Sequence, residues 1–139
     1  MIDIEYDVAA IMQAALQPEI GADFNVYTDR TIRPAKYPAG FLEEIENAVN
    51  VRTSDSGAKE NHATVTFRWT ATSKSKNGKK SECKRIFAMG DAVLTEIGFT
   101  RISKQPYEMN SSTVAQITGR YTAIVDKNKQ IIGGQSIGS

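Results

Sequence analysis

The stretch NHATVTFRWTAT, residues 61–72, alternates apolar and polar side chains along its whole length. Its apolar residues recur at every second position, and the intervening positions hold four threonines and Arg68. This period of two predicts a β-strand with one buried face and one solvated face. Sheets built from such strands are typically antiparallel and covered by helices on one side only. The stretch therefore predicts a two-layer protein.

Two amphipathic helices are predicted, one before this strand in the sequence and one after it. In residues 3–17 the apolar positions follow helical spacing, Asp3 is a candidate N-cap, and Pro18 is expected to end the helix. In residues 81–97 one apolar stripe runs along four turns, with Ser81 as candidate cap and Gly98 as stop. The stripe comprises Cys83, Ile86, Phe87, Gly90, Val93, Leu94 and Ile97. We expect Gly90 to let this helix approach the sheet closely.

Further strands are predicted at residues 24–28, 39–51, 99–104 and 113–125, with a brief one at 130–132. In the second of these, Phe41, Ile45 and Val49 are expected to share one face. The order is α-β-β-β-α-β-β. We expect an α+β two-layer sandwich in which two helices cover one face of a mostly antiparallel sheet of four to five strands. Residues 1–132 would form this single domain, and 133–139 a flexible C-terminal tail.

Composition excludes several classes of protein. The chain has 139 residues, a formal net charge of +1, 40% hydrophobic residues and one cysteine. This balance gives no general attraction to nucleic acid or to an acidic membrane, and a lone cysteine forms no internal disulfide. A secretory signal has basic residues followed by an apolar run, whereas the N-terminal residues of this chain are acidic. No apolar run approaches the ~20 residues that span a bilayer. We expect an aqueous, reducing compartment.

No residue cluster predicts catalysis. His62 is the sole histidine, and no partner that would position it as a base is identifiable. Cys83 lies on the buried stripe, where it is expected to fill the core, although its place in the first helical turn could lower its pKa. Glu44 and Glu46 are expected on one face of their strand and Glu43 on the other, which fits an exposed strand better than an acid–base pair. No nucleotide-binding or nucleophile motif occurs. We therefore expect no enzyme activity, no metal and no cofactor, and a function in binding other protein subunits.

Charge is distributed unevenly along the chain. Residues 1–50 hold nine acidic and three basic residues, whereas residues 74–85 hold six basic residues and one acidic residue. Copies of such a chain can attract one another head to side, although both regions could equally be solvated. The basic segment could also contact phosphates, but it lacks the aromatic residues on which single-stranded bases stack.

The closing part of the chain resembles a known family. Asn110–Thr113, running into Ile117–Asp126, resembles the C-terminal strand of tail proteins from long-tailed bacteriophages and prophages of Gram-positive hosts. Phe99–Ser103 and Tyr37-Pro38-Ala39 are similar as well. Over residues 3–132 the layout is similar to the phage tail terminator, or tail completion, family.

The resemblance implies a structural virion protein that forms a homo-oligomeric ring, expected to be a hexamer. Such a ring caps the tail tube, contacts the tube protein and the head–tail connector or neck protein, and lets DNA pass through its lumen. It would be assembled in the host bacterial cytoplasm and end up in the tail or neck of the virion. Loops of the family reach the neighbouring subunit or the tube, which here makes Arg52, Asp55, Lys59, Lys74, Lys76, Lys79 and Lys80 candidates for the subunit interface. Two alternatives remain open: another head–tail joining protein, or a small nucleic-acid-binding module that uses residues 74–85.

Overall fold

The computed structural model describes residues 3–29, 37–49, 62–74, 79–105, 108–109, 114–126 and 128–131. The elements in this part of the chain are α1 (Glu5–Ile20), β1 (Val26–Tyr27), β2 (Ala39–Val49), β3 (His62–Ser73), α2 (Lys79–Ile97), β4 (Thr100–Lys104), β5 (Glu108–Met109) and β6 (Ala115–Asp126). The predicted tail, residues 133–139, lies outside the described residues.

The strands form one mixed, mostly antiparallel sheet. Five of them follow the order β1-β2-β3-β6-β4, and β5 pairs with β6. Only the β1–β2 pair is parallel. The α+β prediction and its element order are confirmed, with one addition. The two-residue strand β5 lies where a loop was expected, and the brief strand predicted at 130–132 is a single bridge between Val125 and Ile131.

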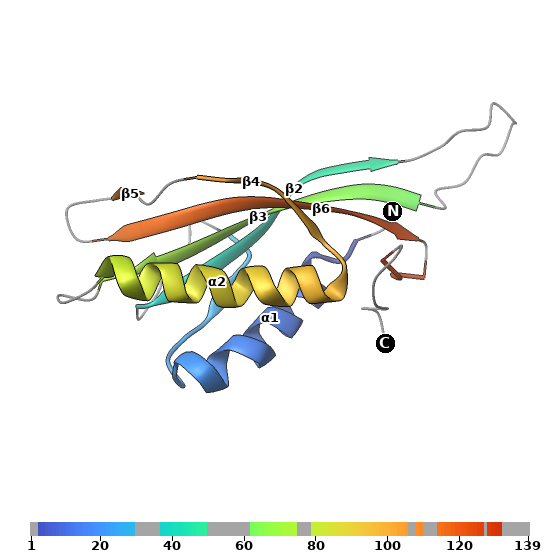
Figure 1. The fold of residues 1–139 in the computed structure, drawn as a ribbon. Coiled ribbons are helices and arrows are strands. Elements are labelled where there is room, and N and C mark those ends of the chain that lie inside the picture. Colours follow the sequence, from blue (N-terminus) through green and yellow to red (C-terminus); the bar gives the residue numbers. More distant parts are fainter. Residues whose placement is uncertain are drawn as a thin grey trace, which may run out of the picture.

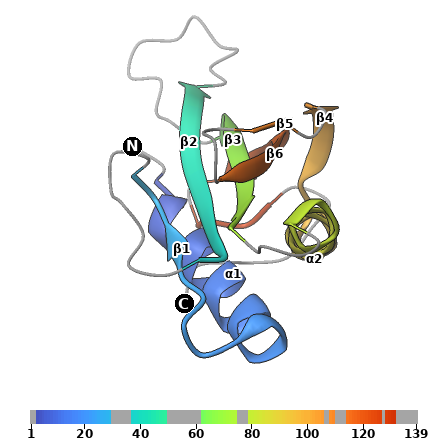
Figure 2. The ribbon, with the colours of Figure 1, turned by 90° about the vertical axis from the view of Figure 1, so that its left-hand side faces the viewer.

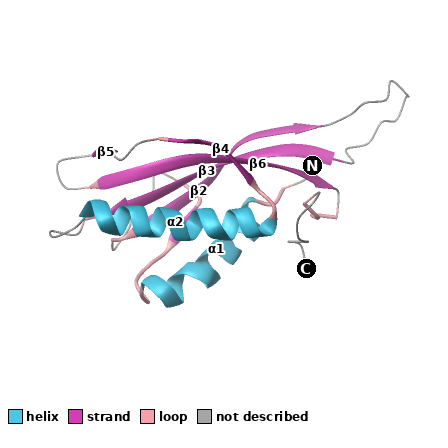
Figure 3. Cartoon of the chain, in the orientation of Figure 1, coloured by secondary structure: helices cyan, strands magenta, loops and turns pink. Residues whose placement is uncertain are grey.

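Both helices cover the same face of this sheet. Figure 1 shows α1 and α2 below the sheet, and the colouring of Figure 3 shows the same separation into a helical layer and a strand layer. Seen from the end in Figure 2, α1 lies under β1 and β2, and α2 lies toward β6 and β4. The apolar residues of β3 supply the centre of the core, and each is fully buried: Ala63, Val65, Phe67, Trp69 and Ala71. The period-two prediction for β3 is confirmed on this face.

Trp69 sets the distance between the two layers. A Cβ added to Gly90 of α2 would lie 2.3 Å from the indole atoms Cε2 and Nε1, and one added to Gly40 of β2 would lie 2.5 Å from Cη2. The indole ring is therefore clamped between two residues without side chains. Its Nε1–H donates to the Phe87 carbonyl at 3.3 Å. The predicted close approach at Gly90 is confirmed, and the role of Gly40 adds to it.

The end of α1 differs from the prediction. The helix continues past Pro18 to Ile20, and the Gly21 amide donates to the Gln17 carbonyl at 2.9 Å. A proline this close to the C-terminus removes only one hydrogen bond of the last turns. Tertiary contacts hold the segment, because Gln13 Oε1 accepts from the Val26 amide at 2.7 Å and Gln17 Nε2 donates to the Ala22 carbonyl at 2.9 Å.

The two cap predictions for α2 have different outcomes. The helix begins at Lys79, so Ser81 lies inside the first turn and is not its cap. Gly98 does end the helix, with φ of 118° in the region that favours glycine. The predicted apolar stripe is confirmed, since its large side chains are buried or pack against the core.

A β-bulge corrects the predicted faces of β2. The register with β3 shifts between Glu44 and Glu46, which leaves Ile45 as the extra residue. Glu43 and Glu46 pair with Arg68 and Thr66 on the helix-free face, whereas Glu44 pairs with Phe67 on the helix face. The prediction that Glu44 and Glu46 share a face is therefore wrong. An inserted residue reverses the alternation beyond it.

The expected apolar face of β2 is also wrong. Phe41 lies on the helix-free face, where its ring centroid is 5.7 Å from that of Tyr27. Ile45 occupies the bulge, and Leu42 rather than Phe41 faces the helices opposite Trp69. Leu42 is fully buried there. The side chain of Val49 lies outside the described residues.

Candidate functional site

The helix-free face of the sheet is lined mainly by polar side chains of β2, β3 and β6. We call it the open face. It was expected to be solvated, yet Thr70 is completely buried and Thr72 and Thr118 are nearly so. The Thr70 and Thr118 hydroxyls lie 3.1 Å apart across two strands, and the Thr72 hydroxyl donates to the Ala39 carbonyl at 2.7 Å. These short side chains stand beside larger neighbours, such as Phe41 opposite Thr70, and they satisfy one another's hydrogen bonds.

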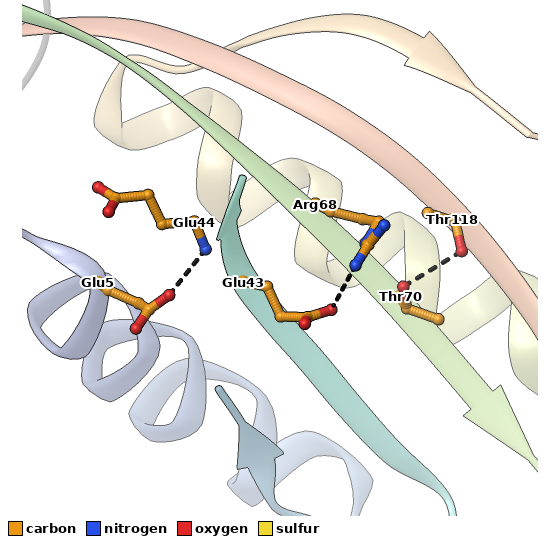
Figure 4. A network of polar contacts seen from close by, with 6 residues as sticks. All are labelled: Glu5, Glu43, Glu44, Arg68, Thr70 and Thr118. Carbon is orange, nitrogen blue, oxygen red and sulfur yellow. Dashed lines mark hydrogen bonds and ion pairs between the residues drawn. The ribbon is translucent and has the colours of Figure 1, made fainter. Parts of the chain in front are cut away.

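A row of charges crosses the middle of the open face. Arg68 lies between Glu43 on β2 and Arg120 on β6, its direct neighbours in the strand register. Arg68 Nη2 is 3.1 Å from Glu43 Oε1 (Figure 4). Arg120 is exposed, and the structure gives its guanidinium no carboxylate partner among the described residues. The charge across the face therefore changes from negative at β2 to positive at β6.

The outer edge of β2 is acidic and is joined to α1. Glu5 Oε2 accepts a hydrogen bond from the Glu44 amide at 2.8 Å, as Figure 4 shows. Burial raises the pKa of the Glu44 carboxyl, the hydrogen bond from Asn47 lowers it, and the charges of Asp3 and Glu5 raise it further. Several carboxylates thus gather at this edge of the sheet.

The opposite edge, β4, is basic and exposed. All five residues from Thr100 to Lys104 are exposed, and this strand has its own bulge between Arg101 and Ser103. Arg101 Nη1 is 3.3 Å from Asp91 Oδ1 of α2, and the same carboxylate oxygen accepts the Tyr121 hydroxyl proton at 2.6 Å. Burial and this hydrogen bond raise the pKa of Tyr121 well above its ordinary value.

Sequence reasoning missed this basic edge. It concentrated on residues 74–85, where the basic side chains are dense, whereas Arg101, Lys104 and Arg120 come together only through the pairing of β4 with β6. One local signal was available. A short strand with charged side chains and no apolar alternation is typical of a sheet edge.

Most of the predicted interface residues lie outside the part of the chain that the structure describes. Arg52, Asp55, Lys59 and Lys76 are outside the described residues, and so is the side chain of Lys79. Lys74 is exposed, with its ammonium nitrogen 4.6 Å from the centroid of the Tyr37 ring. Lys80 is exposed in the first turn of α2. Their assignment to a subunit interface stays a prediction.

His62 and Cys83 were considered as candidates for a catalytic role. His62 is exposed at the first position of β3. Cys83 is fully buried, its thiol donates to the Ala71 carbonyl at 3.2 Å, and burial raises its pKa to about 11. Core packing of Cys83 is confirmed. The expected place in the first helical turn is wrong, because α2 begins at Lys79 and Cys83 lies in its second turn, and burial raises the pKa of the thiol rather than lowering it.

The described residues contain no group of three or more histidine, cysteine, aspartate or glutamate side chains placed to hold a metal ion. Neither described helix is long and apolar enough to cross a membrane. Compared with known proteins, the chain matches no protein-family model and no curated protein.

Proposed function

We propose that this chain is a structural protein of long-tailed bacteriophages, a tail terminator that forms a ring, caps the tail tube and joins it to the head connector. The resemblance that motivates the proposal falls on elements of the sheet. Ile117–Asp126 lies within β6, Phe99–Ser103 covers all of β4 but its last residue, and Tyr37-Pro38-Ala39 leads into β2. The α+β architecture is the one that the resemblance implies.

One observation carries the proposal: the sheet has two dissimilar exposed edges. β2, flanked over only two residues by β1, carries carboxylates, and β4 carries basic side chains. Figure 2 displays β2 and β4 on opposite sides of β3 and β6. A subunit in a closed ring needs two different contact surfaces, since each copy meets one neighbour on each side. Among the described residues, no strand pairs with the outer side of β4, and β1 pairs with only two residues of β2, so both edges can make such contacts.

The proposed ring has three partners. Copies of the chain form the ring itself, the tube protein lies beneath it, and the connector or neck protein lies above. DNA passes through the lumen without being read. This chain needs no catalytic group for that role, because capping acts by occupying the end of a growing polymer.

The test combines purified protein with tail tubes of the same phage. Negative-stain electron microscopy should show rings in solution or at one end of the tubes, and added protein should stop the tube protein from elongating. A protein that stays monomeric in solution and on tubes, and leaves tube length unchanged, would overturn the proposal.

Two other outcomes are separable. Labelling of assembled virions at the neck, without binding to bare tubes, would assign the chain to head–tail joining instead. DNA binding that weakens with salt, and is lost when Lys76, Lys79 and Lys80 are neutralised together, would favour the nucleic-acid-binding alternative.

A further inference from the structure

The exposed large hydrophobic residues of the described chain form two pairs, one on α1 and β2 and the other on β4 and β6. Tyr6 is 71% exposed and Ile45 36%, whereas Ile102 is 55% exposed and Ile124 44%. Tyr6 of α1 and Ile45 of β2 each follow one partner of the Glu5–Glu44 hydrogen bond, so their backbones lie near the outer edge of β2. Ile102 is the bulged residue of β4, and Ile124 lies two positions beyond the residue of β6 that pairs with the start of β4.

Charges of mainly one sign lie near each apolar pair, although Asp91 is paired with Arg101 and Asp126 lies two positions beyond Ile124. We define the acidic edge as Asp3, Tyr6, Glu44, Ile45 and Glu46, and the basic edge as Arg101, Ile102, Lys104, Arg120 and Ile124. Glu46, Lys104 and Arg120 are exposed, and none of the three forms an ion pair with a described residue. Lys104 instead has its ammonium nitrogen 5.5 Å from the centroid of the Phe87 ring. The chain thus presents one exposed apolar pair near Glu46 and another near Lys104 and Arg120, three charges of which none has an ion-pair partner among the described residues.

We infer that the basic edge of one copy docks against the acidic edge of the next copy. This inference rests on the proposed ring and names the contact between its subunits. Lys104 and Arg120 would oppose Glu46 and the neighbouring carboxylates, and the exposed isoleucines would cover Ile45 and Tyr6. Burial of the apolar side chains supplies affinity, and the charges set register and direction.

The same charges exclude a two-fold dimer. A symmetric contact would place acidic edge on acidic edge, or basic edge on basic edge, and like charges across an interface oppose association. Charged side chains and a bulge on an edge strand ordinarily prevent it from pairing with copies of itself. Here the charges oppose pairing only with an edge of like charge, because an edge of opposite charge is attracted. Head-to-tail contacts of this kind close into a ring when the rotation between copies permits.

Charge reversal tests the inference on the full chain. Glu46→Lys places a basic side chain at the acidic edge, and Lys104→Glu places an acidic side chain at the basic edge. Each variant alone should associate about tenfold or more weakly than wild type, since an attraction of roughly 0.5–1 kcal/mol becomes a repulsion of similar size. An equimolar mixture should recover wild-type assembly as alternating copies, because Lys at position 46 of one variant then meets Glu at position 104 of the other, and Glu46 meets Lys104 at the next contact.

A matched control separates this contact from net charge. Glu19→Lys changes the net charge by the same amount as Glu46→Lys at an exposed position of α1, and this control should assemble like wild type. Mass would be measured by sedimentation velocity, and rings would be counted on tail tubes by electron microscopy. Circular dichroism of each variant should match wild type, which ensures that lost assembly does not reflect unfolding.

Each result has one meaning. Recovery in the mixture, with an unaffected control, supports the edge-to-edge contact. Variants that assemble and cap tubes as wild type does would overturn the contact while leaving the capping function in place. Loss in both single variants without recovery in the mixture would overturn it as well. If wild type forms rings through this contact but never caps tubes, the contact stands and the proposed function fails.

Discussion

Replacing Gly90 by alanine probes the contact that holds α2 against the sheet. The added methyl group would lie 2.3 Å from Trp69 Cε2 and Nε1 and 2.5 Å from Cζ2. Ordinary contacts begin at 3.4 Å, so helix and indole must separate by about 1 Å. The indole cannot move away freely, because Gly40 of β2 bounds its other end and its Nε1–H is bonded to the Phe87 carbonyl.

The expected change follows from three terms of known sign. Alanine stabilises the interior of a helix by about 1 kcal/mol relative to glycine. Forcing a methyl group into a packed core costs about 1–3 kcal/mol. Loss of the indole hydrogen bond costs about 1 kcal/mol more. The free energy of unfolding should therefore fall by about 1–3 kcal/mol, opposite to the effect that helix propensity alone predicts.

Urea unfolding followed by tryptophan fluorescence and circular dichroism would measure this change. Ala92→Gly, at an exposed position of the same helix, is the matched control and should cost about 1 kcal/mol through propensity alone. In a Trp69→Leu background, where the indole is absent, Gly90→Ala should lose most of its penalty. Stabilisation by Gly90→Ala in the wild-type background would refute the clamp.

Three further predictions concern polar groups. Burial raises the pKa of Glu44 above its ordinary 4.5, so the folded protein binds this proton more tightly than the unfolded chain does, and stability falls as pH rises through that window. Glu44→Gln should therefore be more stable than wild type at pH 7, a gain that disappears below pH 4.5; an equal gain at all pH values in thermal melts would contradict the assignment. Tyr121→Phe removes the 2.6 Å hydrogen bond to Asp91 and should lower the free energy of unfolding by about 1–2 kcal/mol, whereas an unchanged urea midpoint would show that the bond contributes nothing. Thr70→Val leaves the Thr118 hydroxyl without its partner and should cost about 1 kcal/mol, while the double substitution to valine should be nearly neutral; additive losses in a double-mutant cycle would argue against a coupled pair.

Periodic patterns made most of the fold predictable. The alternation in β3 and the stripe of α2 each reflect burial of one face. A buried face can be recognised from the sequence wherever apolar residues recur with a regular period. Gly90 was recognisable for a related reason, because a residue without a side chain in an apolar stripe indicates a close approach. The assignment of helices to one face followed from the polar side chains on the other face of β3.

The candidate surface was less predictable. The sequence showed an acidic N-terminal third and a basic segment at 74–85, but the basic edge described here consists of Arg101, Ile102, Lys104, Arg120 and Ile124. These residues are dispersed along the chain, and only the antiparallel pairing of β4 with β6 gathers them. Counting charges along the sequence therefore does not reveal that these residues are neighbours in the fold.

The amino-acid sequence by itself determined the two layers, the element order and the core around Trp69, because alternation and helical spacing are local records of which side is buried. Only the tertiary structure decided which faces the carboxylates of β2 occupy, since one bulged residue, Ile45, reverses the alternation and has no signature of its own. It also decided that α1 passes Pro18 and that Thr70 is buried among polar neighbours. In each case contacts between distant segments outweigh a local preference of about 1–3 kcal/mol.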